Sequence, residues 1–250
     1  MPEPIQHVLP LTSTTDSAVT EPSVAVLPIG AFEQHGPHMP LATDTLVAVA
    51  ISNAIAEVVP VRQLPPITIS CSHEHAAFPG TVSISASTLA AIVTDIAMSL
   101  RGQGIKYLIL VNAHGGNYVL ANVVQQANAE RPGSMALYPN RADWDEARVA
   151  AGMETTAHDD MHAGELEGSI LLAAWPSYLR DGWSDRWAED DHTVTDRRHL
   201  LVSGTGAYSE TGIVGPPSLA KSEKGAAALM RLGQNAAEVI TVLTREAAKA

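Results

Sequence analysis

The sequence predicts an α/β fold with a mostly parallel central sheet that helices cover on both faces. Short apolar segments typical of buried strands alternate with segments of helical periodicity between residues 23 and 140. Parallel strands need right-handed crossover connections, which place helices on both faces of the sheet. The chain has 250 residues, no internal repeat and no low-complexity linker. We therefore expect a single domain over residues 1–250, with residues 1–22 as a loose leader.

Strands and helices are assigned from their apolar pattern and their end signals. Residues 23–27 form a β-branched apolar run that ends at Pro28, and residues 107–111 are the clearest central strand. Ser87 is a good N-cap for a helix over residues 88–101. The remaining elements are short strands at 61–64, 67–70 and 135–138, helices at 44–58, 165–175, from 119 to Pro132-Gly133 and from 222 onward, and irregular segments at 141–161 and 183–192.

Charge and cysteine content exclude several classes of function. The chain carries 15 Lys and Arg against 27 Asp and Glu, a formal charge of -12, so neither nucleic acid nor an anionic membrane is an expected partner. Cys71 is the only cysteine, which excludes a disulfide framework and thiolate-rich metal sites and favours the cytoplasm. No apolar run reaches roughly 18 residues, so no membrane span is expected.

The loop after the first strand carries residues suited to a metal ion. Glu33 and His35 are two positions apart, so an extended backbone would point both side chains to the same side. Asp44 follows where a helix should begin. Either Thr43 or Asp44 could cap this helix, but the Asp44 carboxylate is equally well placed as a bridging ligand. The loop alone therefore leaves open a metal site or a capped helix after a polar loop.

Two later segments carry similar residues. His114 follows the strand at 107–111, and His162 stands just before the helix that begins at Glu165. The loops after two parallel strands meet at the carboxyl edge of a sheet, where ligands bind in this fold class. Glu165 and Glu167 cannot share one helical face, so only one of them should point to the site.

A third polar cluster, His73-Glu74-His75, alternates as residues in a strand do. It is either a polar sheet end or a set of groups that orient a substrate. Trp183 and Trp187 lie in the irregular segment 183–192, which we expect to form a lid or a subunit contact.

Taken together, these motifs resemble the creatininase (creatinine amidohydrolase) family over residues 23–175. The resemblance implies a three-layer α/β/α fold, two divalent ions, Zn or Mn, per chain, and hydrolysis of a non-activated amide C-N bond. It also implies a homo-oligomer, with the hexamer as the common form. By motif position the metal ligands are Glu33, His35, Asp44 as the bridge, and His114. The fifth ligand is Glu167, with Glu165 as the alternative.

The sequence departs from the family pattern at one informative position. Creatinine hydrolases carry a Glu two residues after the histidine of the third-strand loop, and Gly116 stands there. Creatinine itself is therefore in doubt, and the expected substrate is a small cyclic amide or a formamide. A peptidase of the type that trims the mycofactocin precursor is the second reading, although that branch usually has Arg-Thr-Glu where Glu165-Leu166-Glu167 stands. A non-catalytic metal-binding module is the third.

The expected mechanism follows from the ligand types. Carboxylates and imidazoles suit Zn or Mn, and two ions about 3.5 to 4 Å apart can hold one bridging water that becomes a hydroxide near neutral pH. The hydroxide attacks the carbonyl carbon, and His162 is expected to act as the acid and base. The residues expected to contact the small-molecule amide substrate are Glu74, His75, Asp160 and Glu165.

Overall fold

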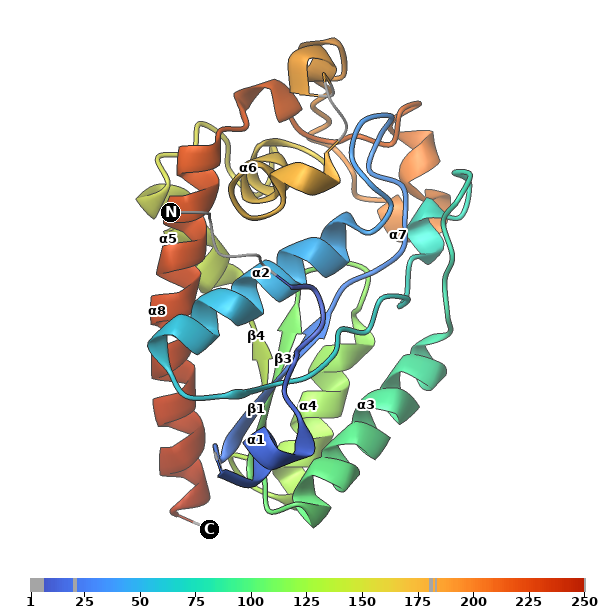
Figure 1. The fold of residues 1–250 in the computed structure, drawn as a ribbon. Coiled ribbons are helices and arrows are strands. Elements are labelled where there is room, and N and C mark those ends of the chain that lie inside the picture. Colours follow the sequence, from blue (N-terminus) through green and yellow to red (C-terminus); the bar gives the residue numbers. More distant parts are fainter. Residues whose placement is uncertain (1–6, 20–21, 180–181, 183, 250) are drawn as a thin grey trace.

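The central sheet has four strands, all parallel. The computed structural model describes residues 7–19, 22–179, 182 and 184–249. Its strands are β1 (Val24–Ile29), β2 (Arg62–Gln63), β3 (Tyr107–Asn112) and β4 (Met135–Tyr138), in the order β2-β1-β3-β4 (Figure 1). The longest pairing joins β1 and β3 along their whole length, from Val24 opposite Tyr107 to Ile29 opposite Asn112. Both strands therefore end at the same edge of the sheet.

Helices cover both faces of the sheet. Alternate residues of β1 enter opposite cores: Val24 and Val26 enter one, and Ala25, Leu27 and Ile29 enter the other. The first core is closed by α2 (Thr43–Val58), α5 (Arg141–Ala150), α6 (Glu165–Ala174) and α8 (Ser222–Ala247). The second is closed by α3 (Ala86–Gly102) and α4 (Val119–Glu130), which lie together in Figure 1. The predicted three-layer α/β/α fold is confirmed.

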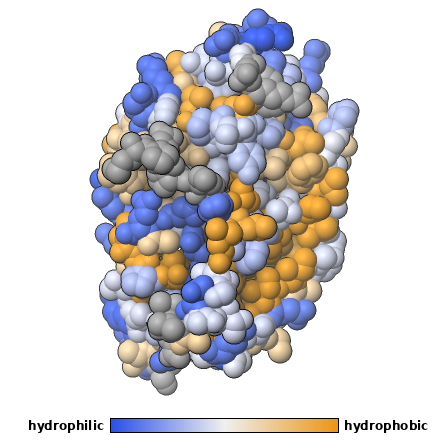
Figure 2. All heavy atoms as spheres, viewed as in Figure 1, coloured by the Kyte–Doolittle hydropathy of each residue, from blue (hydrophilic) through white to orange (hydrophobic). Residues whose placement is uncertain are grey.

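Short helical turns complete the described chain. They are the helices α1 (Thr14–Val19) and α7 (Leu200–Ser203) and the 3-10 turns η1 (His73–His75), η2 (Pro176–Tyr178), η3 (Ser184–Glu189), η4 (Thr205–Ala207) and η5 (Pro217–Leu219). No described helix has the length and apolar character needed to cross a membrane. Figure 2 shows hydrophobic residues gathered on the visible surface over α3, a helix whose Met98 is 61% exposed.

Several element boundaries differ from those predicted. The first strand continues through Pro28, because its carbonyl still accepts a hydrogen bond from the Ile67 N-H at 2.9 Å. Around Ile67 there is only an isolated bridge to Ile29, not the strand expected at 67–70. The cap of α3 is Ser85 rather than Ser87, since the Ser85 hydroxyl accepts from the Thr88 N-H at 3.1 Å. The leader contains α1, while residues 1–6, 20 and 21 lie outside the described part of the chain.

Two predicted irregular segments are more ordered than expected. The first half of 141–161 is α5, which begins with a capping box between Asn140 and Asp143. In the second, Trp187 is only 2% exposed and belongs to the first core, so it does not mark an exposed contact surface. Trp183 lies outside the described residues.

Candidate metal centre

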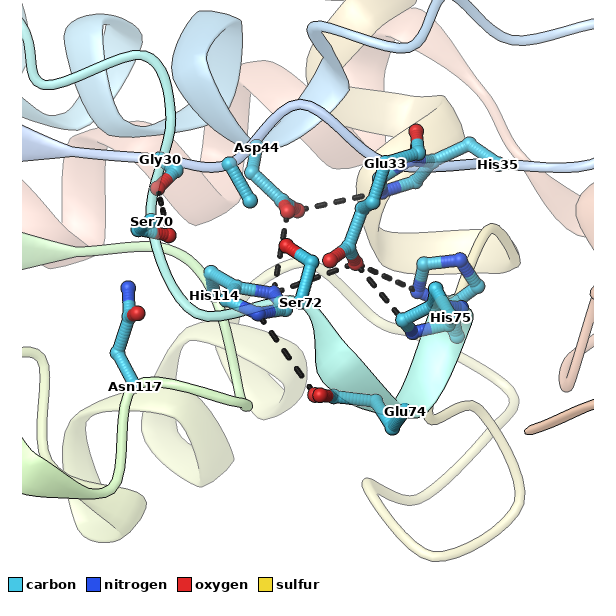
Figure 3. A network of polar contacts seen from close by, with 12 residues as sticks. Gly30, Glu33, His35, Asp44, Ser70, Ser72, Glu74, His75, His114 and Asn117 are labelled. Carbon is cyan, nitrogen blue, oxygen red and sulfur yellow. Dashed lines mark hydrogen bonds and ion pairs between the residues drawn. The ribbon is translucent and has the colours of Figure 1, made fainter. Parts of the chain in front are cut away.

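A buried cluster of acids and imidazoles lies at the carboxyl edge of β1 and β3 (Figure 3). The loop after β1 contributes Glu33 and His35, the first turn of α2 contributes Asp44, and the loop after β3 contributes His114. Glu33, His35, Asp44 and His114 are at most 4% exposed. Glu167 joins them from the first turn of α6, and His162 joins them from the segment just before that helix. The fold thus brings together side chains from segments far apart in the sequence.

The donor atoms form three groups that could each hold a metal ion. The groups are Glu33, Asp44 and His114, then His35, Asp44 and Glu167, then Glu33, His35 and His162, with the atoms of each within 4.8 Å of one another. Asp44 belongs to the first two groups through different oxygens. Its Oδ1 lies 3.2 Å from His35 Nε2, and its Oδ2 lies 3.2 Å from His114 Nδ1. One carboxylate can therefore bridge two ions.

Main-chain carbonyls orient the three imidazoles of these groups. His35 Nδ1 donates to the Glu33 carbonyl at 3.1 Å, and His114 Nε2 donates to the Cys71 carbonyl at 2.7 Å. His162 Nε2 donates to the Gln34 carbonyl at 2.7 Å. A carbonyl only accepts, so in each neutral ring the proton is assigned to the outer nitrogen and the lone pair faces the carboxylates. This is the outer support that metal-bound histidines ordinarily have.

The carboxylates are short of hydrogen-bond donors. Both Glu33 oxygens and Asp44 Oδ2 are buried and accept no hydrogen bond from the described residues. An unsatisfied buried charged group costs more than about 1 to 3 kcal/mol, and a cation that binds these oxygens removes that cost. The residues present therefore fit divalent metal ions.

The pKa values show how strongly these acids attract positive charge. Burial alone would lower the pKa of His35, but the Asp44 and Glu167 charges outweigh burial and raise it to about 9. For His114, Glu33 and Asp44 likewise overcome burial and raise the pKa well above its usual value. Burial raises the pKa of Glu167 to about 7. Protons thus collect between the acids, where a metal ion would replace them.

Gln34, which sequence reasoning did not single out, contacts His75 through its side chain and His162 through its main-chain carbonyl. Its Oε1 accepts from the Gly36 N-H at 2.9 Å, and its Nε2 donates to the Gly212 carbonyl at 3.0 Å and to His75 Nδ1 at 2.8 Å. His75 must then carry its proton on Nε2, which lies 3.4 Å from Glu33 Oε1. Burial lowers the pKa of His75 to about 3, so this ring is neutral, and the nitrogen that faces Glu33 carries a proton instead of the lone pair that a metal ion would need.

Glu167 and Glu165 point in different directions, as their spacing predicts. Glu167 Oε2 accepts from the Ala163 N-H at 2.6 Å and lies 3.8 Å from His35 Nε2. Ala163 holds this N-H in place with a left-handed φ of 56°, which is uncommon for a residue other than glycine. Glu165 is fully buried and binds Lys224 Nζ, the Thr155 hydroxyl and two main-chain N-H groups. The structure therefore favours Glu167 over Glu165 for the metal site.

Two residues expected to contact substrate have internal partners instead. Glu165 is enclosed by the contacts just described. Asp160 Oδ2 accepts from Arg148 Nη1 and from the Leu166 N-H, both at 2.9 Å. These buried carboxylates hold the start of α6 in place, which argues against a contact with substrate, and their substrate-binding role stays a prediction. Arg148 and Lys224 gave no sequence signal, since their partners lie elsewhere along the chain.

The cluster at 73–75 forms the turn η1 and not a strand, so its two histidines do not share a face. His75 enters the site, whereas His73 Nδ1 lies 3.3 Å from the Ser83 hydroxyl in an exposed position. Glu74 Oε1 lies 3.7 Å from His114 Nε2. A Cβ at Gly116 would overlap Glu74 Oε1, so the glycine leaves room for this acid. Ser72 in the same segment has a buried hydroxyl with no described partner.

The fold and the site together define a class: parallel α/β/α proteins with a buried acid and imidazole centre that can hold metal. The family model Creatininase, described as creatinine amidohydrolase, matches residues 11–240, and the chain belongs to this family. It is a hydrolase, and its homologues in this family act on non-standard amide bonds.

Similar proteins include a peptidase and a creatinine amidohydrolase. The mycofactocin precursor peptide peptidase of Mycobacterium tuberculosis is 34% identical over 232 residues, which are 86% of this chain and 84% of that protein. The creatinine amidohydrolase of Pseudomonas putida is 34% identical over 171 residues, 62% of this chain and 66% of that protein. The solved structure of creatininase with Mn has a TM-score of 0.75 at 24% identity and covers 87% of this chain and 89% of that one. This structural likeness supports the fold.

Proposed function

We propose that the chain is a dinuclear metal-dependent amidohydrolase that cleaves a non-activated amide bond in a short peptide. The observation that carries the metal-dependent hydrolysis is the position of Asp44, whose two oxygens face two different groups of donor atoms. Glu33, Asp44 and His114 would hold one ion, and His35, Asp44 and Glu167 the other. Zn and Mn both suit such a donor set.

Two observations support a peptide ahead of a small cyclic amide or a formamide. The peptidase relative matches 86% of this chain, whereas the creatinine amidohydrolase matches 62%. Gly116 stands where creatinine hydrolases carry a ligand acid, and Glu74 fills the space beside it. The cyclic amide or formamide therefore becomes the second candidate.

The chain's own residues perform the proton transfers. Two divalent ions, when bound, supply Lewis acidity that activates water and polarises a carbonyl group. His162 presents its Nδ1 lone pair inward, 3.8 Å from Glu33 Oε1, and its Nε2-H is held by the Gln34 carbonyl. It can accept a proton at Nδ1 and return it to the leaving nitrogen. His75 lies beside Glu33 and Glu74 lies beside His114, and both would contact the substrate.

His162 also belongs to the third donor group, so its role needs a separate test. We assign it the proton transfer because the two groups that share Asp44 already account for both ions. In a His162→Ala variant we expect full metal content and a kcat reduced by about 10²-fold or more, in the range of general acid and base catalysis. Loss of one ion in this variant would make His162 a ligand instead.

Metal analysis with a peptide and amide substrate panel tests the function as a whole. We expect about two ions per chain and loss of hydrolysis after chelation, with recovery on adding Zn or Mn. Bound metal without turnover of any amide would support the non-catalytic module. Absence of bound metal in the purified and metal-incubated chain would contradict the proposal.

The cytoplasmic location and the homo-oligomer, with a hexamer as the form common in the family, stay predictions. The hydrophobic surface over α3 in Figure 2 supports an oligomer. Light scattering on the purified chain measures its molar mass in solution.

A further inference from the structure

A cleft of about 460 Å³ lies between η1, the start of α4 and α7. Cys71, Glu74 and Gly116 form its inner end. Tyr118, Leu201 and Val202 also line it, with exposed fractions of 61%, 77% and 87%. Large apolar side chains this exposed at one cleft are typical of a binding surface.

The inner end of the cleft adjoins the metal centre on the far side of the His114 ring. The Cys71 carbonyl accepts from His114 Nε2 at 2.7 Å. Glu74 Oε1 lies 3.7 Å from the same nitrogen (Figure 3). The other ring nitrogen, His114 Nδ1, faces Glu33 and Asp44. A molecule in the cleft is therefore separated from the donor atoms by the width of one imidazole ring.

The charge of the cleft favours a positive group at its inner end. Among the described residues that line it there is no Lys or Arg, and Glu74 is the only acid. The Glu74 side chain is 16% exposed, so it can be reached from the cleft without being fully solvated. A carboxylate would be repelled there, whereas an amino group would form a charge-assisted hydrogen bond.

We infer that this cleft binds the part of the substrate that flanks the scissile amide: an apolar side chain against Tyr118, Leu201 and Val202, and a free amino group beside Glu74. The substrate class is thus a short peptide with an apolar residue and an unblocked amine. The volume is in the range of small-ligand sites and accommodates one or two residues. This inference rests on the proposed peptide hydrolysis.

The experiment compares three peptides on the metal-loaded full chain. One has a free amino group and leucine next to the scissile bond, the second is its N-acetylated form, and the third has aspartate in place of leucine. We expect kcat/KM for the first to exceed that for each of the others by about tenfold or more, the usual value of one apolar or charged contact. Calorimetric binding of the same peptides gives a readout that does not depend on turnover.

Two variants test which residues of the cleft determine the preference for a free amine and for an apolar side chain. Glu74→Gln should lower the preference for the free amine over the acetylated peptide about tenfold, mainly through KM, with metal content unchanged. Val202→Asp should weaken the leucine peptide by about tenfold through the lost apolar contact. Val149→Asp is the matched control. Val149 is 82% exposed and lies in the last turn of α5, as Val202 lies in α7, but Val149 does not line the cleft.

The outcomes separate the inference from the function on which it rests. Selective binding without hydrolysis would refute the proposed function and leave the cleft assignment standing. Equal binding of the three peptides, or equal effects of Val202→Asp and Val149→Asp, would overturn the cleft assignment even if hydrolysis is found. A changed molar mass for Val202→Asp with unchanged selectivity would show an interface between copies and would also overturn it.

Discussion

Replacing Lys224 by Met tests whether Glu165 anchors the start of α6 or serves the metal site. Lys224 is 8% exposed, and its ammonium group binds Glu165, Glu154 Oε1 at 3.1 Å and the Leu219 carbonyl at 3.1 Å. Removing one partner of a buried ion pair costs about 3 to 5 kcal/mol. Glu165 retains the Thr155 hydroxyl and two main-chain donors. We therefore expect the lower end, about 3 kcal/mol of the free energy of unfolding.

Thermal unfolding under metal-saturated conditions measures this loss. For a chain of this size, about 3 kcal/mol corresponds to a Tm lower by roughly 6 to 12 °C. The double variant Lys224→Met/Glu165→Gln should recover about half of the loss, because a neutral amide needs no counter-charge. Lys221→Met is the control, since Lys221 is exposed and its side chain should contribute less than about 0.5 kcal/mol.

Two single variants, Glu165→Gln and Glu167→Gln, separate the two glutamates by metal content. Glu165→Gln should keep its metal, and Glu167→Gln should lose it from the group with His35 and Asp44. A Lys224→Met variant that loses less than about 1 kcal/mol would refute the energetic reasoning. Metal loss in Glu165→Gln, with full retention in Glu167→Gln, would reverse the assignment of the two residues.

Three further changes test the centre. Asp44→Asn should empty both metal positions with an unchanged far-UV circular dichroism spectrum, and two retained ions by elemental analysis would show that Asp44 only begins α2. Gly116→Ala should lower stability by about 1 to 3 kcal/mol in chemical denaturation, because its Cβ would lie 2.6 Å from the Cys71 carbonyl oxygen and overlap Glu74. Ala163→Gly should leave Tm unchanged or raise it, since glycine adopts a φ of 56° without strain, and a loss above about 1 kcal/mol would count against that strain.

The fold and the location of the centre follow from local patterns in the sequence. The apolar runs around Val26 and Ile109 predicted parallel strands of one sheet, and parallel strands bring their carboxyl ends to one edge. The structure pairs these two strands directly. That rule was enough to bring His114 close to Glu33. The two-residue spacing of Glu165 and Glu167 predicted that they would point apart, which the structure shows.

Long-range partners limit what the sequence reveals. Lys224 and Arg148 resemble ordinary helix residues. Only the packing of α8 on α6 brings Glu165 to Lys224, and only the folding of the segment before α6 against α5 brings Asp160 to Arg148. The period-two pattern of His73 and His75 suggested a strand, but a tight turn uses the same residues. Asn140 and Asp143 did carry a local signal for α5, the reciprocal capping box, although the polar composition of the segment concealed it.

Gly212, which is distant in the sequence, fixes the position of Gln34 and through it the positions of two imidazoles. Gly212 accepts the Gln34 amide through its carbonyl, has a φ of 84°, and any side chain there would collide with Gln34. A side chain at this position would displace Gln34, which holds His75 through its amide group and His162 through its carbonyl, without altering a single acid or histidine. Relatives that share every ligand motif can therefore differ in catalytic tuning, and this loop is the place to examine when they do.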